Sequence, residues 1–239
     1  MKKLLIILFS SMVYSQHPIT GVVEYTVDAI ETANPLAVAN TSPDFSKRKE
    51  LLEIFSNQPV TGFTLEFNGN EAIYKRVINE MQSDANQKTK PKFLEVIGGG
   101  SGLFYSNSEE KTTLTQKNSL GELLLISDKF PEWELTSETK KIGNYTCFKA
   151  KYIAKNGNKN LTDEVWYTPE IPVQFGPTKY IGLPGLVLEV IAGKVRFTAT
   201  KIQLNSQQPV SIERPNKGTK ITEEEYTKKL QQIGTELGF

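Results

Sequence analysis

The chain of 239 residues contains one histidine and one cysteine, which excludes most chemistry that depends on those side chains. A serine or cysteine nucleophile activated by histidine needs a base in a structured region, whereas His17 lies near the expected mature N-terminus. The usual zinc sites combine three or four Cys and His ligands. We therefore predict no metal and no cofactor, and we expect Cys147 to be a buried apolar residue without a disulfide partner.

Carboxylates are the remaining candidates for acid–base chemistry. Adjacent acidic residues occur at Glu109-Glu110, Asp163-Glu164 and Glu223-Glu224-Glu225. Neighbours on a strand point to opposite faces, so no such pair forms an acid–base pair by itself. A glycosidase needs two carboxylates that face each other across a cleft. A hydrolase that uses Glu189, Asp163 or Glu164 therefore stays open as an alternative function.

The most unusual stretch runs from residue 163 to residue 191, where prolines and glycines separate two apolar strands. Proline restricts φ and glycine allows positive φ, so this long loop should have one defined shape. Two interpretations stay open: a rigid connection packed on Trp166 and Tyr180, or a binding lip at one end of the sheet. The candidate ligand-binding or partner-binding residues are Trp166, Tyr167, Pro169, Pro172, Gly176, Pro177, Gly182, Leu183, Pro184, Gly185, Leu186 and Glu189.

Alternation of apolar and polar residues dominates the rest of the chain and is typical of half-buried strands. The pattern predicts a mainly β (α+β) fold, with a curved antiparallel sheet or half-open barrel of about nine to eleven strands and one or two packed helices. Asn68-Gly69 between two such runs predicts a hairpin. The predicted strands are 23–29, 63–67, 73–78, 102–106, 111–116, 122–127, 133–139, 145–154, 162–167, 186–191 and 195–204.

The last hairpin allows two turns. An Ala192-Gly193 turn would place Glu189 opposite Arg196 as a cross-strand ion pair. A Gly193-Lys194 turn would place Glu189 opposite Thr198 instead. We favour the first arrangement, because it also pairs apolar residues on one face.

The predicted domain organisation has four parts. Residues 1–15 form a signal peptide, and residues 16–204 form the β domain with a helix near 43–57. Residues 205–220 form a linker, and residues 221–239 form a helix packed on the domain. Thr222 and Glu225 are spaced as a capping box. Tyr226, Leu230, Ile233 and Leu237 form one apolar stripe along that helix.

The first fifteen residues have the pattern of an export signal. Lys2 and Lys3 precede a short apolar run, and Ser15 stands before the expected cleavage point. The apolar run is too short to span a bilayer, which needs about 20 residues. The chain has 28 Lys and Arg against 27 Asp and Glu, so loss of two lysines changes the net charge from +1 to −1. A nucleic-acid partner that binds by bulk charge is excluded.

Three strings in the second half of the chain resemble the GLPGLI family of exported bacterial proteins. They are the segments 166–172, 175–177 and 182–189, and the last reads Gly-Leu-Pro-Gly-Leu-Val where the family has Ile in the final position. The segment 142–147 is similar to the part that precedes this motif. The resemblance implies a Gram-negative cell-envelope location, most often the periplasm, and it supplies no catalytic residue.

These observations lead us to expect an exported, non-enzymatic cell-envelope protein. Its expected ligand is an apolar molecule, a lipid or an outer-membrane protein, since the strands suggest a sheet covered on both faces. A carboxylate-dependent periplasmic hydrolase and a surface assembly or adhesion partner are the alternatives. We expect no transmembrane span in the mature chain.

Overall fold

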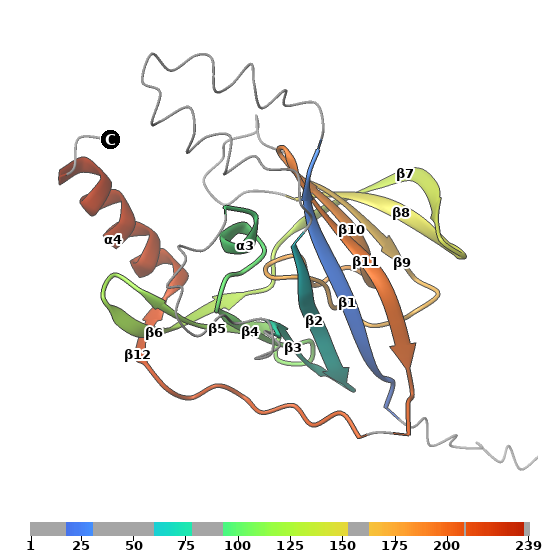
Figure 1. Ribbon diagram of the computed structural model, residues 1–239, viewed down its shortest axis with the longest axis horizontal. Helices are drawn as coiled ribbons and strands as arrows, with labels where there is room; N and C mark the ends of the chain where they lie inside the picture. Colours follow the sequence, from blue (N-terminus) through green and yellow to red (C-terminus); the bar gives the residue numbers. More distant parts are fainter. Residues whose placement is uncertain (1–17, 31–59, 78–92, 153–162, 208, 237–239) are drawn as a thin grey trace, which may run out of the picture.

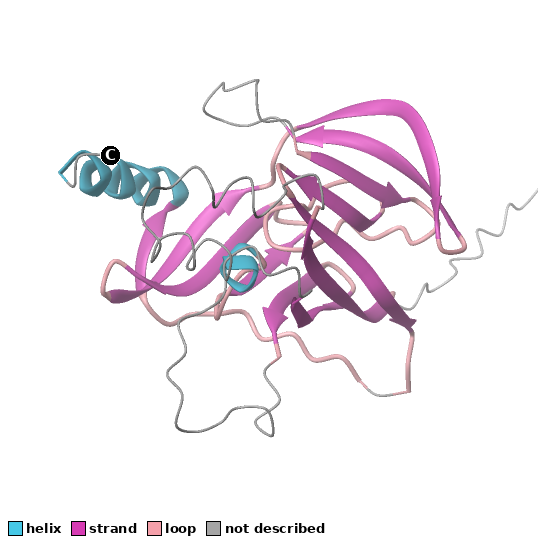
Figure 2. Ribbon diagram, turned by 45° about the horizontal axis from the view of Figure 1, so that its top comes forward, coloured by secondary structure: helices cyan, strands magenta, loops and turns pink. Residues whose placement is uncertain are grey.

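The computed structural model describes residues 18–30, 60–77, 93–152, 163–207 and 209–236. Its strands form one open 12-stranded sheet in the order β12-β6-β5-β4-β3-β2-β1-β11-β10-β9-β8-β7. All neighbours are antiparallel except β12 and β6, which run parallel. Figures 1 and 2 show the sheet curving around its interior, so the predicted curved antiparallel sheet with few helices is confirmed.

The elements have the following bounds. The strands are β1 (Thr20–Ala29), β2 (Val60–Asn68), β3 (Glu71–Arg76), β4 (Leu103–Asn107), β5 (Thr112–Ser119), β6 (Glu122–Lys129), β7 (Trp133–Ile142), β8 (Tyr145–Tyr152), β9 (Glu164–Thr168), β10 (Leu186–Ala192), β11 (Val195–Leu204) and β12 (Thr219–Thr222). The helices in the described part of the chain are α3 (Phe93–Ile97) and α4 (Glu223–Glu236). None of the described helices is long and apolar enough to cross a membrane.

The two faces of the sheet are distinguished by the alternation of side chains along each strand. On β1, the buried residues Val23, Tyr25 and Val27 point to what we call the inner face. Tyr25 packs edge-on against Tyr74 of β3, with ring centroids 6.0 Å apart. Tyr105 and Leu114 are paired across β4 and β5 and define the opposite, outer face.

The connection between β9 and β10, residues 169–185, folds back over the inner face, and we call it the plug. Ile171, Val173 and Phe175 alternate with exposed residues and are all nearly fully buried. The Phe175 ring lies 5.9 Å from the ring of Phe67 on β2. An extended segment with period-two burial thus acts as an additional layer of the core without joining the sheet.

Two glycines permit the plug to pack this closely. A Cβ on Gly185 would lie 2.8 Å from the backbone nitrogen of Pro169 and nearer still to the carbonyl of Thr168. A Cβ on Gly176 would lie 2.7 Å from the Cβ of Val187. Both contacts are shorter than real Cβ contacts, so only glycine fits at these positions.

The hairpins confirm part of the sequence prediction and correct the rest. The β2–β3 hairpin forms as expected, but Asn68 still pairs with Glu71, so the turn is Gly69-Asn70. In the β10–β11 hairpin Glu189 faces Thr198, so the favoured Ala192-Gly193 turn is wrong and the alternative Gly193-Lys194 turn is found. Gly193 has φ of +59°, which a turn of this kind requires and glycine adopts at little cost.

The predicted linker 205–220 makes contacts with the sheet and contributes a strand to it, so it is more than a spacer. Residues 205–207 and 209–218, which we call the strap, cross the outer face, where Asn68 donates a hydrogen bond to the carbonyl of Val210 at 2.9 Å. Thr219 and Lys220 already belong to β12. The capping box is confirmed, because Thr222 Oγ1 accepts from the Glu225 amide at 3.2 Å while the Glu225 carboxylate accepts from the Thr222 amide at 2.7 Å.

Only the start of α4 packs on the described sheet. Tyr226 is buried against Leu124 and Ile126 of β6. Leu230 and Ile233 are exposed, so the apolar stripe does not lie against the domain along its length as we expected. The predicted signal peptide 1–15, His17, the helix at 43–57 and Leu237 lie outside the described residues.

Candidate functional site

A groove of about 1490 Å³ opens on the inner face beside the plug. Its floor is β5, and its rim is made by turns: the turn after α3, the end of the plug and the β10–β11 turn. The first turn of α4 closes the remaining side. The groove therefore lies where the apolar inner face of the central strands changes into a polar surface.

The floor of the groove is polar because of the residue pattern of β5. Thr113, Thr115 and Lys117 line the groove, and they lie on one face of the strand. Thr115 pairs with Phe104 on one side and with Ile126 on the other. Hydroxyl groups, which both donate and accept hydrogen bonds, thus stand between apolar neighbours on the adjacent strands.

One end of the groove holds two tyrosines, a lysine and a carboxylate. The Tyr180 hydroxyl donates to Asp163 Oδ2 at 2.9 Å, and Lys179 Nζ lies 3.2 Å from the same oxygen. The Lys179 ammonium also lies 4.3 Å from the centre of the Tyr152 ring. This is the range of a cation–π interaction. The Tyr152 ring packs edge-on against Trp133, with centroids 5.6 Å apart.

The electrostatics of this end are dominated by burial and negative charge. Burial raises the pKa of Tyr152, and the charges of Asp128, Asp163 and Glu223 raise it further. Burial likewise raises the pKa of Tyr180, with Asp163 adding to the effect. Both phenols are therefore neutral hydrogen-bonding groups at neutral pH, and Asp128, Asp163 and Glu223 are all among the residues that line the groove.

The other end of the groove repeats the pairing of a tyrosine with a lysine. Lys117 Nζ lies 4.3 Å from the centre of the Tyr226 ring. The Tyr226 hydroxyl is 3.0 Å from Ser119 Oγ. Two aromatic rings, each with an ammonium group over it, thus stand at opposite ends of a floor that carries threonine hydroxyls.

This arrangement is suited to a neutral ligand with many hydroxyl groups. Carboxylates can accept hydrogen bonds from it, and threonine hydroxyls can both donate and accept them. In the described residues, no group of three His, Cys, Asp or Glu side chains is placed to hold a metal ion.

Most of the residues singled out in the 163–191 stretch do not meet at a surface. Tyr167, Leu183 and Leu186 are buried in the core. Gly176, Pro177 and Gly185 are buried inside the plug and Gly182 is half-buried, whereas Pro169, Pro172 and Pro184 are exposed at its bends. The arrangement is that of a rigid connection whose apolar side chains fill the interior.

Trp166 and Glu189 lie on the outer face and form a separate cluster. Glu189 forms an ion pair with Lys140, not with Arg196, which pairs with Asp28 at 2.7 Å. The Lys140 ammonium also lies 4.3 Å from the Trp166 ring. The predicted Glu189–Arg196 pair is therefore wrong, because the hairpin register places Arg196 opposite Ile191.

The groove residues were mostly missed by sequence reasoning. Asp163 was predicted as a candidate catalytic carboxylate, but the sequence of β5 showed only the alternation of an ordinary strand. Tyr152, Lys179 and Tyr226 come from three distant parts of the chain. Only the curvature of the sheet and the position of the plug bring them to one groove.

The fold and the groove define an open, curved β-sheet domain with a plugged interior and a polar inner groove. A model of the family described as "N-glycanase peptide, N-terminal domain" matches residues 107–227, just over half of the chain. The chain belongs to this family. The matched segment contains the groove floor, the plug and the first turn of α4.

Two solved structures have a similar fold. "Structure of PNGF-II in P21 space group" has a TM-score of 0.52 and 17% identity, and it aligns with 87% of this chain. "Structure of PNGF-II in C2 space group" has a TM-score of 0.53 and 15% identity, and it aligns with 89% of this chain. The chain spans about a third of the length of each, 32% and 33%. A comparison with curated proteins gives no match.

The family match corrects two expectations. The resemblance to the GLPGLI family is wrong, since the family found is the N-glycanase domain family. The string that suggested it lies in the plug, where Gly182 has φ of +86° and Gly185 touches backbone. Tight packing requires such residues in any plug of this shape, so the string alone does not separate families.

The expected function is corrected by the same finding. We expected a non-enzymatic cell-envelope protein that binds an apolar ligand, a lipid or an outer-membrane protein. The matching domain family takes its name from an enzyme, an N-glycanase, which contradicts that expectation. The interior that was expected to receive an apolar ligand is filled by the side chains of the plug.

Proposed function

We propose that the chain takes part in the processing of N-linked glycans, and that the groove is its carbohydrate-binding surface. The observation that carries this proposal is the polar floor of β5 between two lysine-covered tyrosines, Tyr152 and Tyr226. Sugars carry many hydroxyl groups, and the carboxylates and threonine hydroxyls of the groove offer hydrogen-bond partners for them. The family name, which refers to an N-glycanase, supports a protein-linked glycan as the ligand.

The size of the groove agrees with an oligosaccharide rather than a single small metabolite. Its volume of about 1490 Å³ exceeds the range of about 300–1,000 Å³ typical of small-molecule pockets. Its long floor would place successive sugar units along Thr113, Thr115 and Lys117. The rim turns would contact the units that extend out of the groove.

Binding is tested with a peptide that carries one N-linked glycan, compared with the same peptide after the glycan has been removed. Isothermal titration should show binding of the glycopeptide only. Thr115→Val removes one hydroxyl while keeping the side-chain shape, and it should weaken binding by about tenfold, the loss expected for one hydrogen bond. Equal binding of both peptides, or no binding, would overturn the proposal.

A matched control is available on the same strand. Gln116 follows Thr115 and points to the outer face, where it pairs with Leu125. Gln116→Ala should therefore leave glycopeptide binding unchanged. Equal losses in the two variants would show that the effect comes from the stability of β5 and not from the groove.

Hydrolysis in the groove is the second candidate, and the presence of Asp128, Asp163 and Glu223 in the lining of the groove favours it. Two carboxylates across a cleft can serve as acid and base. Mass spectrometry of the titration mixtures reports whether the glycan leaves the peptide. Release that is abolished by Asp163→Asn would assign this role, whereas an intact glycopeptide after prolonged incubation would dismiss it.

We propose further that the protein acts after export, in a form cleaved after Ser15. The Lys2-Lys3 start and the following apolar run support this location. The test is fractionation of cells that express the full chain, followed by N-terminal sequencing. A periplasmic product that begins at Gln16 is expected, and a cytoplasmic product that retains Met1 would contradict the proposal.

A further inference from the structure

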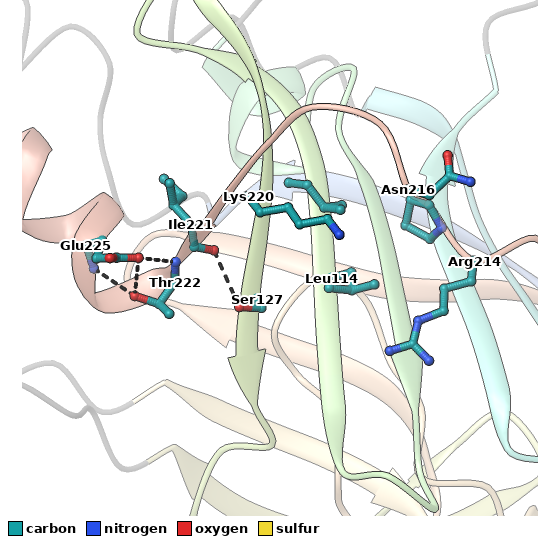
Figure 3. A pocket seen from close by; sticks show the side chains of 10 residues that line it. Leu114, Ser127, Arg214, Asn216, Lys220, Ile221, Thr222 and Glu225 are labelled. Carbon is teal, nitrogen blue, oxygen red and sulfur yellow. Dashed lines mark hydrogen bonds between the residues drawn. The ribbon is translucent and has the colours of Figure 1, made fainter.

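A second pocket lies on the outer face, opposite the groove, where the strap meets β5, β6 and β12. Its volume is about 580 Å³, within the usual range for small ligands. Figure 3 shows it between the strap, with Arg214 and Asn216, and the start of α4, with Thr222 and Glu225. No residue named so far in the groove contributes to it, so a ligand here would be independent of the glycan.

The floor of this outer pocket is apolar. Leu114 and Leu125 come from the neighbouring strands β5 and β6, and they lie side by side on the outer face. Pro215 of the strap is buried at one side. An apolar group of a ligand would therefore be removed from water on this floor, which is the main source of affinity for small molecules.

The charged side chains around the pocket differ in whether they already have partners within the protein. Arg214 forms an ion pair with Glu110 at 3.0 Å and lies over the Tyr105 ring, so its position is fixed. At the other end, the carboxylate of Glu225 is engaged by Thr222. The hydrogen bond from the Thr222 backbone amide, together with that from its hydroxyl, lowers the pKa of Glu225.

Lys220 is the exception. In Figure 3 its side chain extends over the pocket from β12, away from Glu225 and toward the Arg214 end. In the described part of the chain its ammonium has neither a hydrogen-bond partner nor a carboxylate within ion-pair distance. An uncompensated cation above an apolar floor is complementary to a ligand that joins an anionic group to an apolar body.

We propose that this outer pocket binds a small organic carboxylate with an apolar ring or branched chain. The carboxylate accepts from Lys220 and faces the fixed guanidinium of Arg214, while the apolar part lies on Leu114 and Leu125. The site is separate from the proposed glycan function and does not depend on it.

The probe is 3-phenylpropionate, compared with its neutral analogue 3-phenylpropionamide, and binding to the full chain is measured by calorimetry. The carboxylate should bind about tenfold more tightly than the amide, because only it forms the charge-assisted hydrogen bond. Lys220→Met should remove this preference and Lys220→Arg should restore it. Equal binding of the two probes, or no binding, would overturn the proposal.

The matched control is Lys217→Met, since Lys217 is an exposed lysine of the strap, three residues before Lys220, that does not line the pocket. It should leave the carboxylate preference unchanged. An equal loss in the Lys217 and Lys220 variants would mean a general attraction of anions to this face, which contradicts a site. Thermal unfolding of each variant separates these outcomes from a loss of folded protein.

Discussion

The plug and the groove lie side by side on the inner face, yet they differ in what their residues do. In the plug, alternate side chains such as Phe175 are buried, and two glycines touch backbone. In the groove, Thr113, Thr115 and Lys117 are only half-buried, and they line a surface that a ligand can reach. The glycine- and proline-rich motif of this chain therefore serves packing, whereas the surface suited to a ligand is assembled from ordinary strands and turns.

The largest expected effect comes from the plug glycines. Gly185→Ala would force a Cβ into the backbone at Thr168 and Pro169, so we expect a loss above about 4 kcal/mol or no folded protein. Urea unfolding followed by circular dichroism measures it. The control is Gly234→Ala in α4, where a Cβ meets nothing within 4 Å, and there we expect a gain of up to about 1 kcal/mol.

The apolar residues of the plug should rank next. Phe175→Ala removes a ring that is 1% exposed and packs on Phe67, so a loss of about 3–5 kcal/mol is expected. The exposed neighbour Gln174→Ala should change stability by less than about 0.5 kcal/mol. A small effect of the Phe175 variant would mean that the plug is not part of the core.

Tyr180 stands at the boundary between the two regions, and its variant should have an intermediate effect. Tyr180→Phe keeps the ring against Phe197 but removes the hydrogen bond to Asp163. We expect a loss of about 1 kcal/mol of stability. Glycopeptide binding should weaken in the same variant because Asp163 loses its positioning partner. Unchanged binding would place Asp163 outside the site.

The smallest effect concerns the outer cluster. Lys140→Ala and Glu189→Ala, made singly and together, should show a coupling of about 1 kcal/mol, as expected for an ion pair that is only partly exposed. The corresponding cycle for Glu189 and Arg196 should show less coupling, since these residues are not opposite each other. Stronger coupling of Glu189 with Arg196 than with Lys140 would contradict the observed register and would favour the Ala192-Gly193 turn.

Several features could be predicted from the sequence because they depend on local patterns. Alternation identified the strands, and Thr222 with Glu225 identified the start of α4. The turn of the β10–β11 hairpin could not be chosen reliably, because both registers pair apolar residues and differ only in which charges meet. The path of the strap was missed, since its contacts, such as Asn68 with Val210, join residues 142 positions apart.

The site was harder to predict than the fold for the same physical reason. A rigid, glycine- and proline-rich loop attracts notice in a sequence whether its rigidity serves packing or binding. Lys117, Tyr152 and Lys179 belong to no local sequence motif, because each is an ordinary residue of a strand or turn. Only the curvature of the sheet brings them to one groove. Asp163 was the exception, and it was noticed only as half of an acidic pair.

The most direct test of the central claim is hydrogen–deuterium exchange of the full chain with and without the N-linked glycopeptide. We predict slower exchange in the rim turns at Gly99–Gly102, Thr178–Lys179 and Gly193–Lys194, which surround the groove. The strap should be unchanged in the same experiment. Protection confined to the outer face, or no protection at saturating glycopeptide, would contradict the assignment of the groove as the carbohydrate-binding surface.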